Sequence, residues 1–204
     1  MSLILASASP RRRELLSYIT KKFTVIPAVN EEKLDMTLPA DKAVIYIARQ
    51  KAEEVSENHA DDLVIGADTM VFCGNAPLGK PKDSDEAKGM LKALSGNTHQ
   101  VITAVVIARN GKARRSFAVR TDVEFYPLTK NEIDLYVQSG EPMDKAGAYG
   151  IQGKGSLFIK GIKGDYYNVM VLPISRLYRE LQSFDKFRAC SHKAQHASFR
   201  QILP

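Results

Sequence analysis

One run of eleven residues, "LVIGADTMVFC" at 63–73, constrains the fold more than any other part of the chain. It is apolar on both sides of its single aspartate, which is typical of a strand buried on both faces of a sheet. Other apolar or alternating runs precede and follow it, separated by segments with helical periodicity. The pattern predicts strands at 2–6, 23–29, 63–73, 99–109, 117–125, 156–159 and 167–173. We therefore expect an α/β fold in which helices flank a twisted mixed sheet.

Caps and apolar spacing mark the helices. Ser9 is a suitable N-cap, and Thr129 and Glu132 have the spacing of a capping box. The predicted helices begin after Ser9, span about 42–57, run from a cap at Ser84 to Gly96, follow Thr129 and cover 174–181.

The composition is that of one globular domain. With 204 residues, 44% hydrophobic and 25% charged, the chain is long enough to bury a core. No apolar run approaches the ~20 residues of a membrane span, and the first residues lack the basic region of a signal peptide. The two cysteines, Cys73 and Cys190, form no disulfide framework and no metal cluster. We expect a cytoplasmic protein that does not contact a membrane.

The formal net charge is +6, and half of it lies after Ser183. There Asp185 is outnumbered by four cationic side chains: Lys186, Arg188, Lys193 and Arg200. A basic tail is able to contact nucleic acid, but no RNA-binding motif accompanies it. We expect residues 1–184 to form the domain, residues 185–204 to be a loosely ordered extension, and nucleic acid to be the weaker interpretation.

Three arginines, Arg11, Arg12 and Arg13, occupy the first turn of the first predicted helix. The backbone there already has unpaired N–H groups and about half a positive charge, so each cation costs roughly 0.3–1 kcal/mol at an exposed site. A phosphate bound at the helix N-terminus would offset that cost. The alternative is a solvated basic end, and the strand–turn–helix context favours anion binding.

Two charged side chains stand where apolar ones are expected. Asp68 lies in the middle of the apolar strand, where a carboxylate is costly unless it is paired or functional. The flanking Gly66 and Thr69 indicate that the strand opens onto a cleft there. Lys51 continues the apolar stripe of the helix at 42–57, so we expect it to point inward, although its stem is also able to extend past the edge of the core. Together with the arginine turn, these residues indicate a cationic pocket.

Candidate ligand contacts also occupy loops. Lys80, in "LGKPKD", is a candidate phosphate contact, although a loop lysine is more commonly solvated. Glu31 and Glu32, taken with Asp68, are candidate oxygen ligands for a divalent cation.

A glycine-rich run, "GAYGIQG" at 147–153, matches neither the dinucleotide fingerprint nor a P-loop. It still allows the backbone to approach a ligand closely. Gln152 offers an amide that can read the edge of a base.

Six motifs appear in the order seen in the Maf family of nucleotide pyrophosphatases, which the sequence resembles over about residues 2–184. They are "SASPRR", "GADTMV", "LGKP", "LSGNTHQVITAV", "DKAGAYGIQG" and "GDYYNV…LP". The resemblance implies two lobes around a central cleft, as in the related inosine-triphosphatase-like enzymes. It implies hydrolysis of nucleoside triphosphates between the α and β phosphates, and a divalent metal cofactor. Oxygen ligands would suit Mg²⁺ or Mn²⁺.

The resemblance also implies catalytic roles. Asp68 becomes the proton acceptor, and Glu32 (or its neighbour Glu31) becomes the second essential acid. The same three carboxylates become the metal ligands. Lys51 and Lys80 become the contacts to phosphate.

Substrate binding follows in the same way. The resemblance makes Ser7, Arg11 and Arg12 the anion-binding turn. Arg11, Thr69 and Gln152 resemble the branch of the family that acts on dTTP and UTP.

One departure and two alternatives accompany this resemblance. The family usually has a glycine before the last "LP", where this chain has Val171, whose side chain would either narrow the cleft or pack below it. The alternatives are a 7-methyl-GTP pyrophosphatase and a non-catalytic nucleotide-binding regulator of cell division. The resemblance is also compatible with a homodimer.

Overall fold

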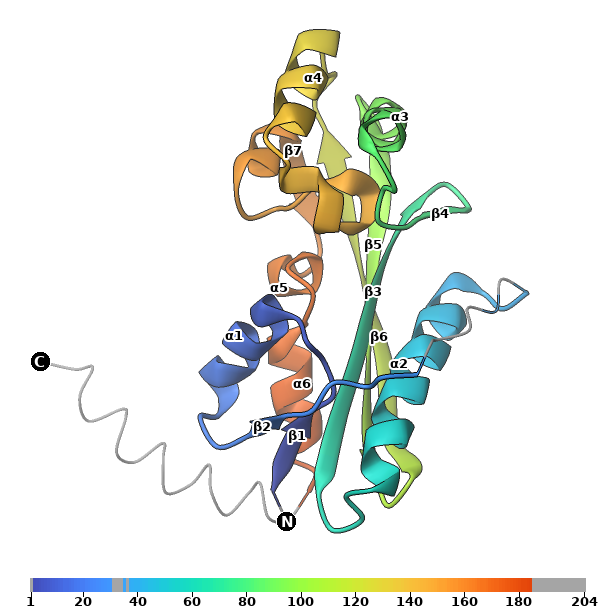
Figure 1. Ribbon diagram of the computed structural model, residues 1–204, viewed down its shortest axis with the longest axis vertical. Helices are drawn as coiled ribbons and strands as arrows, with labels where there is room; N and C mark the ends of the chain where they lie inside the picture. Colours follow the sequence, from blue (N-terminus) through green and yellow to red (C-terminus); the bar gives the residue numbers. More distant parts are fainter. Residues whose placement is uncertain (1, 31–34, 36, 185–204) are drawn as a thin grey trace, which may run out of the picture.

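The computed structural model describes residues 2–30, 35 and 37–184 (Figure 1). Its strands are β1 (Leu3–Leu5), β2 (Thr24–Val25), β3 (Leu63–Cys73), β4 (Ala76–Leu78), β5 (Thr98–Arg109), β6 (Lys112–Phe125) and β7 (Ile159–Lys163). Its helices are α1 (Pro10–Ile19), α2 (Ala40–Glu57), α3 (Ser84–Leu94), α4 (Lys130–Gln138), α5 (Tyr166–Val169) and α6 (Ile174–Leu181). Three short 3₁₀ turns complete the chain, η1 (Glu141–Asp144), η2 (Ala146–Ala148) and η3 (Lys154–Phe158).

The strands form one mixed sheet in the order β2-β1-β3-β5-β6-β7, with β4 paired to β3. β1 is parallel to β2 and β3, whereas the pairs β3–β5, β5–β6 and β6–β7 are antiparallel. The long strands β3, β5 and β6 extend through most of the molecule (Figure 1). The predicted mixed sheet with flanking helices is therefore confirmed.

The long strands carry two separate cores on one face of the sheet. In the lower half of Figure 1, Leu63 and Ile65 of β3 pack with α1 and α6. In the upper half, Val71 of the same strand packs with α3 and α4. The other face is covered by α2, whose Ala48 and other small residues pack on β5. The predicted arrangement of two lobes around a cleft is confirmed, because polar residues of β3 lie between the two cores.

β3 is left without a partner strand along part of one edge. β1 pairs only with Leu63–Ile65, and β4 pairs only with Val71–Cys73. Within the described chain, residues 66–70 therefore have a strand on the β5 side alone. Asp68 lies at the centre of this gap, where a side chain from a central strand can reach a ligand.

Some predicted elements differ from the structure. The strand expected at 23–29 is limited to Thr24–Val25, because its partner β1 is short and Pro27 has no N–H to donate. The strand expected at 156–159 is mostly the turn η3, with β7 starting at its end. The helix expected to be capped by Ser84 is capped by Asp83, whose side chain accepts from the Glu86 N–H.

The segment 167–173 was predicted as a strand but contains the helical turn α5. Asp165 caps this turn by accepting from the Tyr167 N–H. The buried Asn168 side chain then bonds to β5 and β6, accepting from the Thr103 N–H and donating to Val101 O and the Thr121 hydroxyl. A side-chain amide therefore ties this helical turn to the backbone of β5 and to a hydroxyl of β6.

Three expectations fall outside the described residues: the positions of Glu31 and Glu32, and the state of the extension 185–204. No helix within the described ranges is long and apolar enough to cross a membrane.

Candidate active site

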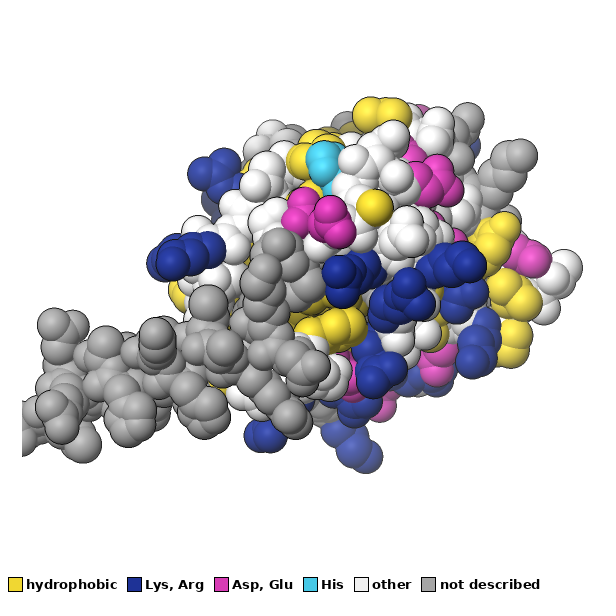
Figure 2. Space-filling model, turned by 90° about the horizontal axis from the view of Figure 1, so that it is seen from below, with side chains coloured by type: hydrophobic (Ala, Val, Ile, Leu, Met, Phe, Trp, Pro, Cys, Tyr) yellow, Lys and Arg dark blue, Asp and Glu magenta, His cyan; other side chains and the backbone are white. Residues whose placement is uncertain are grey.

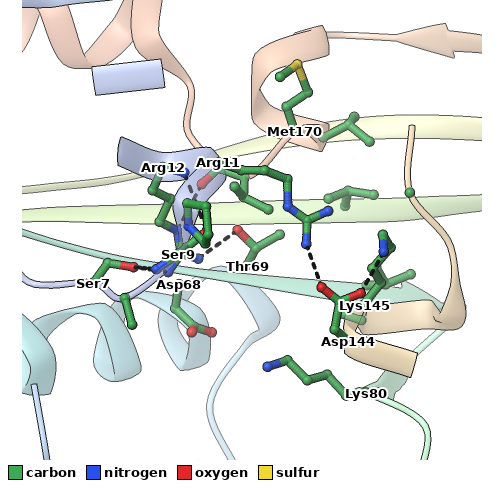
Figure 3. Close-up of a pocket in the computed structure, with 18 of the residues that line it drawn as sticks. Ser7, Ser9, Arg11, Arg12, Asp68, Thr69, Lys80, Asp144, Lys145 and Met170 are labelled. Carbon is green, nitrogen blue, oxygen red and sulfur yellow. Dashed lines mark hydrogen bonds and ion pairs between the residues drawn. The ribbon is translucent and has the colours of Figure 1, made fainter. Parts of the chain in front are cut away.

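A cleft of about 510 Å³ lies between the two lobes, beside the gap at the edge of β3 (Figure 3). It brings together every predicted site residue that the structure describes: Ser7, Arg11, Arg12, Lys51, Asp68, Thr69, Lys80 and Gln152. These residues come from five separate parts of the chain, so the fold itself assembles the site.

The arginine turn forms one wall of the cleft. Ser9 caps α1, and its hydroxyl accepts from the Arg12 N–H, as predicted. The Arg12 side chain is 9% exposed and donates to the Ser7 hydroxyl at 3.3 Å, the Thr69 hydroxyl at 3.2 Å and the Val171 carbonyl at 3.2 Å. These three acceptors are neutral, and they orient the guanidinium at the wall of the cleft, where it can contact an anion.

Asp68 and Lys51 meet at the gap in the sheet edge. Lys51 Nζ donates to Asp68 Oδ1 at 2.7 Å, and the two side chains are 15% and 18% exposed. Lys51 therefore points inward, as its place on the apolar stripe predicted. Gly66 permits this approach of α2 to β3, since a Cβ at residue 66 would lie 2.4 Å from Ala48 O.

Asp68 has one carboxylate oxygen available for chemistry. Among the described residues only Oδ1 accepts a hydrogen bond, and Asp68 lines the cleft. The described part of the chain contains no group of three His, Cys, Asp or Glu residues placed to hold a metal ion. Asp68 is the one predicted metal ligand that the structure places.

Lys80 and Gln152 line the cleft as exposed side chains. Within the described structure, Lys80 has no hydrogen-bond or ion-pair partner, and Figure 3 shows its side chain extending toward the Asp68 side of the cleft. A free ammonium group in this position can meet a phosphate without first breaking another bond.

Asp144 and Lys145 belong to the site but were not predicted as site residues. Arg11 spans the cleft to Asp144, with 3.5 Å between Nη2 and Oδ2, and Lys145 Nζ donates to Asp144 Oδ1 at 2.6 Å (Figure 3). The bond from Lys145, together with the charges of both cations, lowers the pKa of Asp144 despite its partial burial. The signal for them was present in the sequence, because both begin the motif "DKAGAYGIQG" that contains Gln152.

The loop that carries Gln152 is anchored at its far end by Glu141. Glu141 Oε1 accepts from the Tyr136 hydroxyl at 3.0 Å and the Gly155 N–H at 3.2 Å, and Oε2 accepts from the Lys154 N–H at 3.0 Å. Burial acts to raise the pKa of Glu141, but these donors outweigh it and lower the pKa.

At its near end the loop is anchored by Tyr149, which lines the cleft. His99 Nε2 lies 2.7 Å from the Tyr149 hydroxyl, and both rings pack edge-on against Phe125. Burial lowers the pKa of His99 to about 4, so its imidazole is neutral at neutral pH. Within the described structure, His99 Nδ1 has no hydrogen-bond partner.

Val171 has a φ of +103°, a conformation that a β-branched residue rarely adopts. It also lines the cleft, and its carbonyl accepts from Arg12. A glycine would adopt this backbone without strain, which accounts for the glycine that the family usually has here. Val171 therefore borders the cleft at the cost of a strained backbone.

Comparisons with known proteins agree with this site. A family model described as Maf-like protein matches residues 2–184. A protein of Bacillus cereus is 51% identical over 183 residues, which are 90% of this chain and 95% of that protein. A protein of Bacillus mycoides is 50% identical over 183 residues, with the same coverage of both chains. Both are named dTTP/UTP pyrophosphatase.

Two solved structures are distantly similar. The Ham1 protein of Staphylococcus aureus has a TM-score of 0.42 and 14% identity, covering 61% of this chain and 72% of its own. A nucleoside-triphosphatase, or dITP/XTP pyrophosphatase, of Mycobacterium abscessus has a TM-score of 0.42 and 13% identity. The match covers 100% of this chain and 98% of that protein. The sequence relationships are far closer, and on the match over residues 2–184 the chain belongs to the Maf family.

Proposed function

We propose that this protein hydrolyses dTTP and UTP to the nucleoside monophosphate and pyrophosphate. The observation that carries the proposal is the Asp68 carboxylate at the break in the sheet edge, held by Lys51 and facing a cleft rimmed with cations. The proposal is supported by relatives of 50–51% identity that are named for this activity and are covered over 95% of their length.

The charge of the cleft suits a triphosphate. Among the described residues, five cationic side chains line it against two carboxylates: Arg11, Arg12, Lys51, Lys80 and Lys145 against Asp68 and Asp144. Cations that converge from separate elements can contact several phosphate oxygens at once and neutralise the charge that grows on the leaving group. A binding site for an uncharged ligand would gain nothing from this arrangement.

The reaction needs one bond made and one broken at the α phosphorus. A water oxygen attacks the α phosphorus in line, and the bond from that phosphorus to the bridging oxygen breaks. Asp68 Oδ2 accepts the proton of the attacking water, while Lys51 keeps the carboxylate oriented through Oδ1. The departing pyrophosphate is stabilised by contacts with Lys80 and the arginine turn.

We propose Mg²⁺ or Mn²⁺ as the cofactor, with Asp68 as a ligand. A free carboxylate oxygen on the cleft side fits a hard divalent cation, and Glu31 and Glu32 remain the proposed further ligands. When bound, the cation would neutralise charge on the phosphate oxygens.

We propose that the glycine-rich loop, which carries Gln152, recognises the nucleobase of the substrate. Gln152 is exposed at the cleft and can both donate to and accept from the two carbonyls and one N–H of a uracil or thymine edge. The Thr69 hydroxyl is already bonded to Arg12 and, at 2.9 Å, to Thr103. We therefore propose that Thr69 affects substrate choice by holding Arg12.

Product identification tests the proposal. The protein is incubated with UTP, dTTP and 7-methyl-GTP in Mg²⁺, and the products are separated by ion-exchange chromatography. The expected result is UMP or dTMP with an equal amount of pyrophosphate, and slow cleavage of 7-methyl-GTP. Release of UDP and phosphate would contradict the proposed bond cleavage. Tight binding of UTP without turnover would instead identify a nucleotide-binding regulator.

A further inference from the structure

Arg12 is the most deeply buried lysine or arginine in the part of the chain that the structure describes. Many other cationic side chains lie at the surface, as Figure 2 shows for the lower end of the molecule. A cation buried beside the cleft keeps one position only if its N–H groups have acceptors. The groups that fix Arg12 therefore decide where its charge meets a bound phosphate.

One chain of hydrogen bonds leads from Arg12 away from the cleft, across two strands of the sheet. Arg12 Nη2 donates to the Thr69 hydroxyl of β3 at 3.2 Å (Figure 3), and that hydroxyl lies 2.9 Å from the Thr103 hydroxyl of β5. Thr103 donates to the main-chain carbonyl of Asn168, in α5, at 2.9 Å. A hydroxyl has one hydrogen to donate, and a carbonyl only accepts. The three bonds are satisfied together only when Thr69 donates to Thr103, which leaves the lone pairs of Thr69 for Arg12.

A second chain of hydrogen bonds joins Arg12 to Asn168 through Val171. Arg12 Nε donates to the Val171 carbonyl at 3.2 Å, and the Val171 N–H donates to the Asn168 carbonyl at 3.0 Å. Both chains therefore end on one oxygen atom and close a ring of hydrogen bonds that contains Arg12. The strained backbone of Val171, with its φ of +103°, is held by this ring through both its N–H and its carbonyl.

Asn168 is itself fixed by its side chain. Its amide is fully buried, accepts from the Thr103 N–H at 3.1 Å, and donates to the Val101 carbonyl at 3.0 Å and the Thr121 hydroxyl at 2.9 Å. Movement of a buried amide with these partners would leave several polar groups unpaired, which is costly. The carbonyl that receives both chains is consequently held in place by β5 and β6.

We propose that Asn168 and Thr103 are positioning residues, which hold the Arg12 guanidinium where it meets the phosphates of the substrate. Neither of them lines the cleft, so they would act through Arg12 rather than touch the substrate. The inference rests on the proposed function, in which the arginine turn contacts the departing pyrophosphate. It also gives a role to the motif "GDYYNV…LP", which contains Asn168 and to which the proposed function assigns none.

The test is a double-mutant cycle between Thr103 and Arg12. Thr103→Val removes the hydroxyl but nearly keeps the size of the side chain, and Arg12→Ala removes the guanidinium. The matched control is Thr121→Val, because Thr121 is as deeply buried and bonds to the side-chain amide of Asn168 instead of its carbonyl. Circular dichroism verifies folding, and kcat/KM for UTP and the Kd for inorganic pyrophosphate are then measured in Mg²⁺.

We expect Thr103→Val to lower kcat/KM for UTP about tenfold or more and to weaken pyrophosphate binding, because a displaced contact group loses its effect steeply with distance. In the Arg12→Ala background the same substitution should cause no further loss, since its route to the substrate is gone. Thr103→Ser keeps the hydroxyl and should retain most of the activity. Thr121→Val should lower stability but leave kcat/KM near that of the wild type.

Asn168→Ala removes the amide that fixes the end of both chains. Its loss of kcat/KM should exceed that of Thr103→Val and should also disappear in the Arg12→Ala background. Thr103→Val carries the test by itself if Asn168→Ala does not fold.

Three results would overturn the proposal. The first is wild-type kcat/KM and pyrophosphate affinity in Thr103→Val. The second is a loss in Thr103→Val that is equally large with and without Arg12, since the two residues would then act independently. The third is an equal loss in Thr121→Val, which would show a general effect of stability. If the wild type binds UTP without turnover, the proposed function fails, while the pyrophosphate affinities still decide whether Thr103 positions Arg12.

Discussion

The two walls of the cleft are built in different ways. The lower wall consists of the end of β1, the capped helix α1 and the central strand β3. Its charged groups are held by direct side-chain hydrogen bonds, such as those of Arg12 and the bond from Lys51 to Asp68. The upper wall consists of 3₁₀ turns and a glycine-rich loop, and its shape depends on anchors behind it, Glu141 and His99. A rigid wall suits the transfer of a proton at one phosphorus, whereas an anchored loop suits recognition of a base.

Replacement of Asp68 on the lower wall is expected to have the largest effect. Asp68→Asn keeps the shape of the side chain but removes the proposed proton acceptor, so kcat for UTP should fall about 10²–10⁴-fold. The matched control is Asp41→Asn, which removes a carboxylate that also pairs with a cation, Arg120, but at the surface and away from the cleft.

The comparison of these two variants is made by steady-state kinetics, with circular dichroism to verify folding. Asp41→Asn should retain nearly full activity. If folded Asp68→Asn keeps more than about a tenth of the wild-type kcat, Asp68 is not the general base of the reaction.

The His99 anchor of the upper wall should make stability depend on pH. In the unfolded chain the imidazole takes up a proton near its ordinary pKa of 6.5, whereas the folded pKa is about 4. The contribution of His99 to stability is therefore present above pH 6.5 and lost as pH falls toward 4. Between pH 7 and pH 5 the loss should be about 2 kcal/mol in the free energy of unfolding.

Urea denaturation of the wild type and of His99→Gln at several pH values measures this loss. The glutamine can still bond to the Tyr149 hydroxyl but does not titrate, so its stability should change less over the same range. Parallel stability curves for the two proteins would show that His99 does not produce the effect.

Replacement of Glu141 is expected to lower the stability somewhat less than protonation of His99 does. Glu141→Gln replaces one accepting oxygen by an NH₂ group that faces donors, so the free energy of unfolding should fall by about 1–2 kcal/mol. Because the loop that carries Gln152 loosens, KM for UTP should rise several-fold while kcat changes little. A fall in kcat at unchanged KM would place the influence of Glu141 on the chemistry rather than on base recognition.

The smallest expected effect is at Val171, whose carbonyl accepts from Arg12 at the edge of the cleft. Val171→Gly relieves a backbone strain of order 1–3 kcal/mol, offset by about 0.5–1 kcal/mol from the greater freedom of glycine in the unfolded chain. The variant should thus be more stable than the wild type by about 1 kcal/mol in thermal or urea denaturation. Val169→Gly, in α5, is the control and should be less stable; a loss of stability in Val171→Gly would contradict the strain.

The lower wall was largely predictable from the sequence, because its determinants are local. The cap at Ser9, the full extent of β3 and the inward direction of Lys51 follow from residue spacing and from the cost of burying a charge. The gap at the edge of β3 was indicated only by its polar residues, since it depends on where β1 and β4 end.

The upper wall was less predictable, because its shape is set by contacts distant in sequence. Glu141 organises a loop more than ten residues away. Distant contacts also act outside this wall, where Asn168 turns an expected strand into α5 through bonds to β5 and β6. Asp144 and Lys145 begin the motif that contains Gln152, but their pairing with Arg11 across the cleft became apparent only from the fold.

The separation of phosphate binding from base recognition is tested most directly by one ratio, the kcat/KM for UTP divided by that for 7-methyl-GTP. Lys80→Ala removes a cation of the β4–α3 loop that is proposed to contact phosphate common to both substrates, so both values should fall and the ratio should stay constant. Gln152→Ala removes the proposed base contact, so the value for UTP should fall about tenfold and the ratio should fall with it. A ratio that changes as much in Lys80→Ala as in Gln152→Ala, or a wild type that prefers 7-methyl-GTP, would contradict the account.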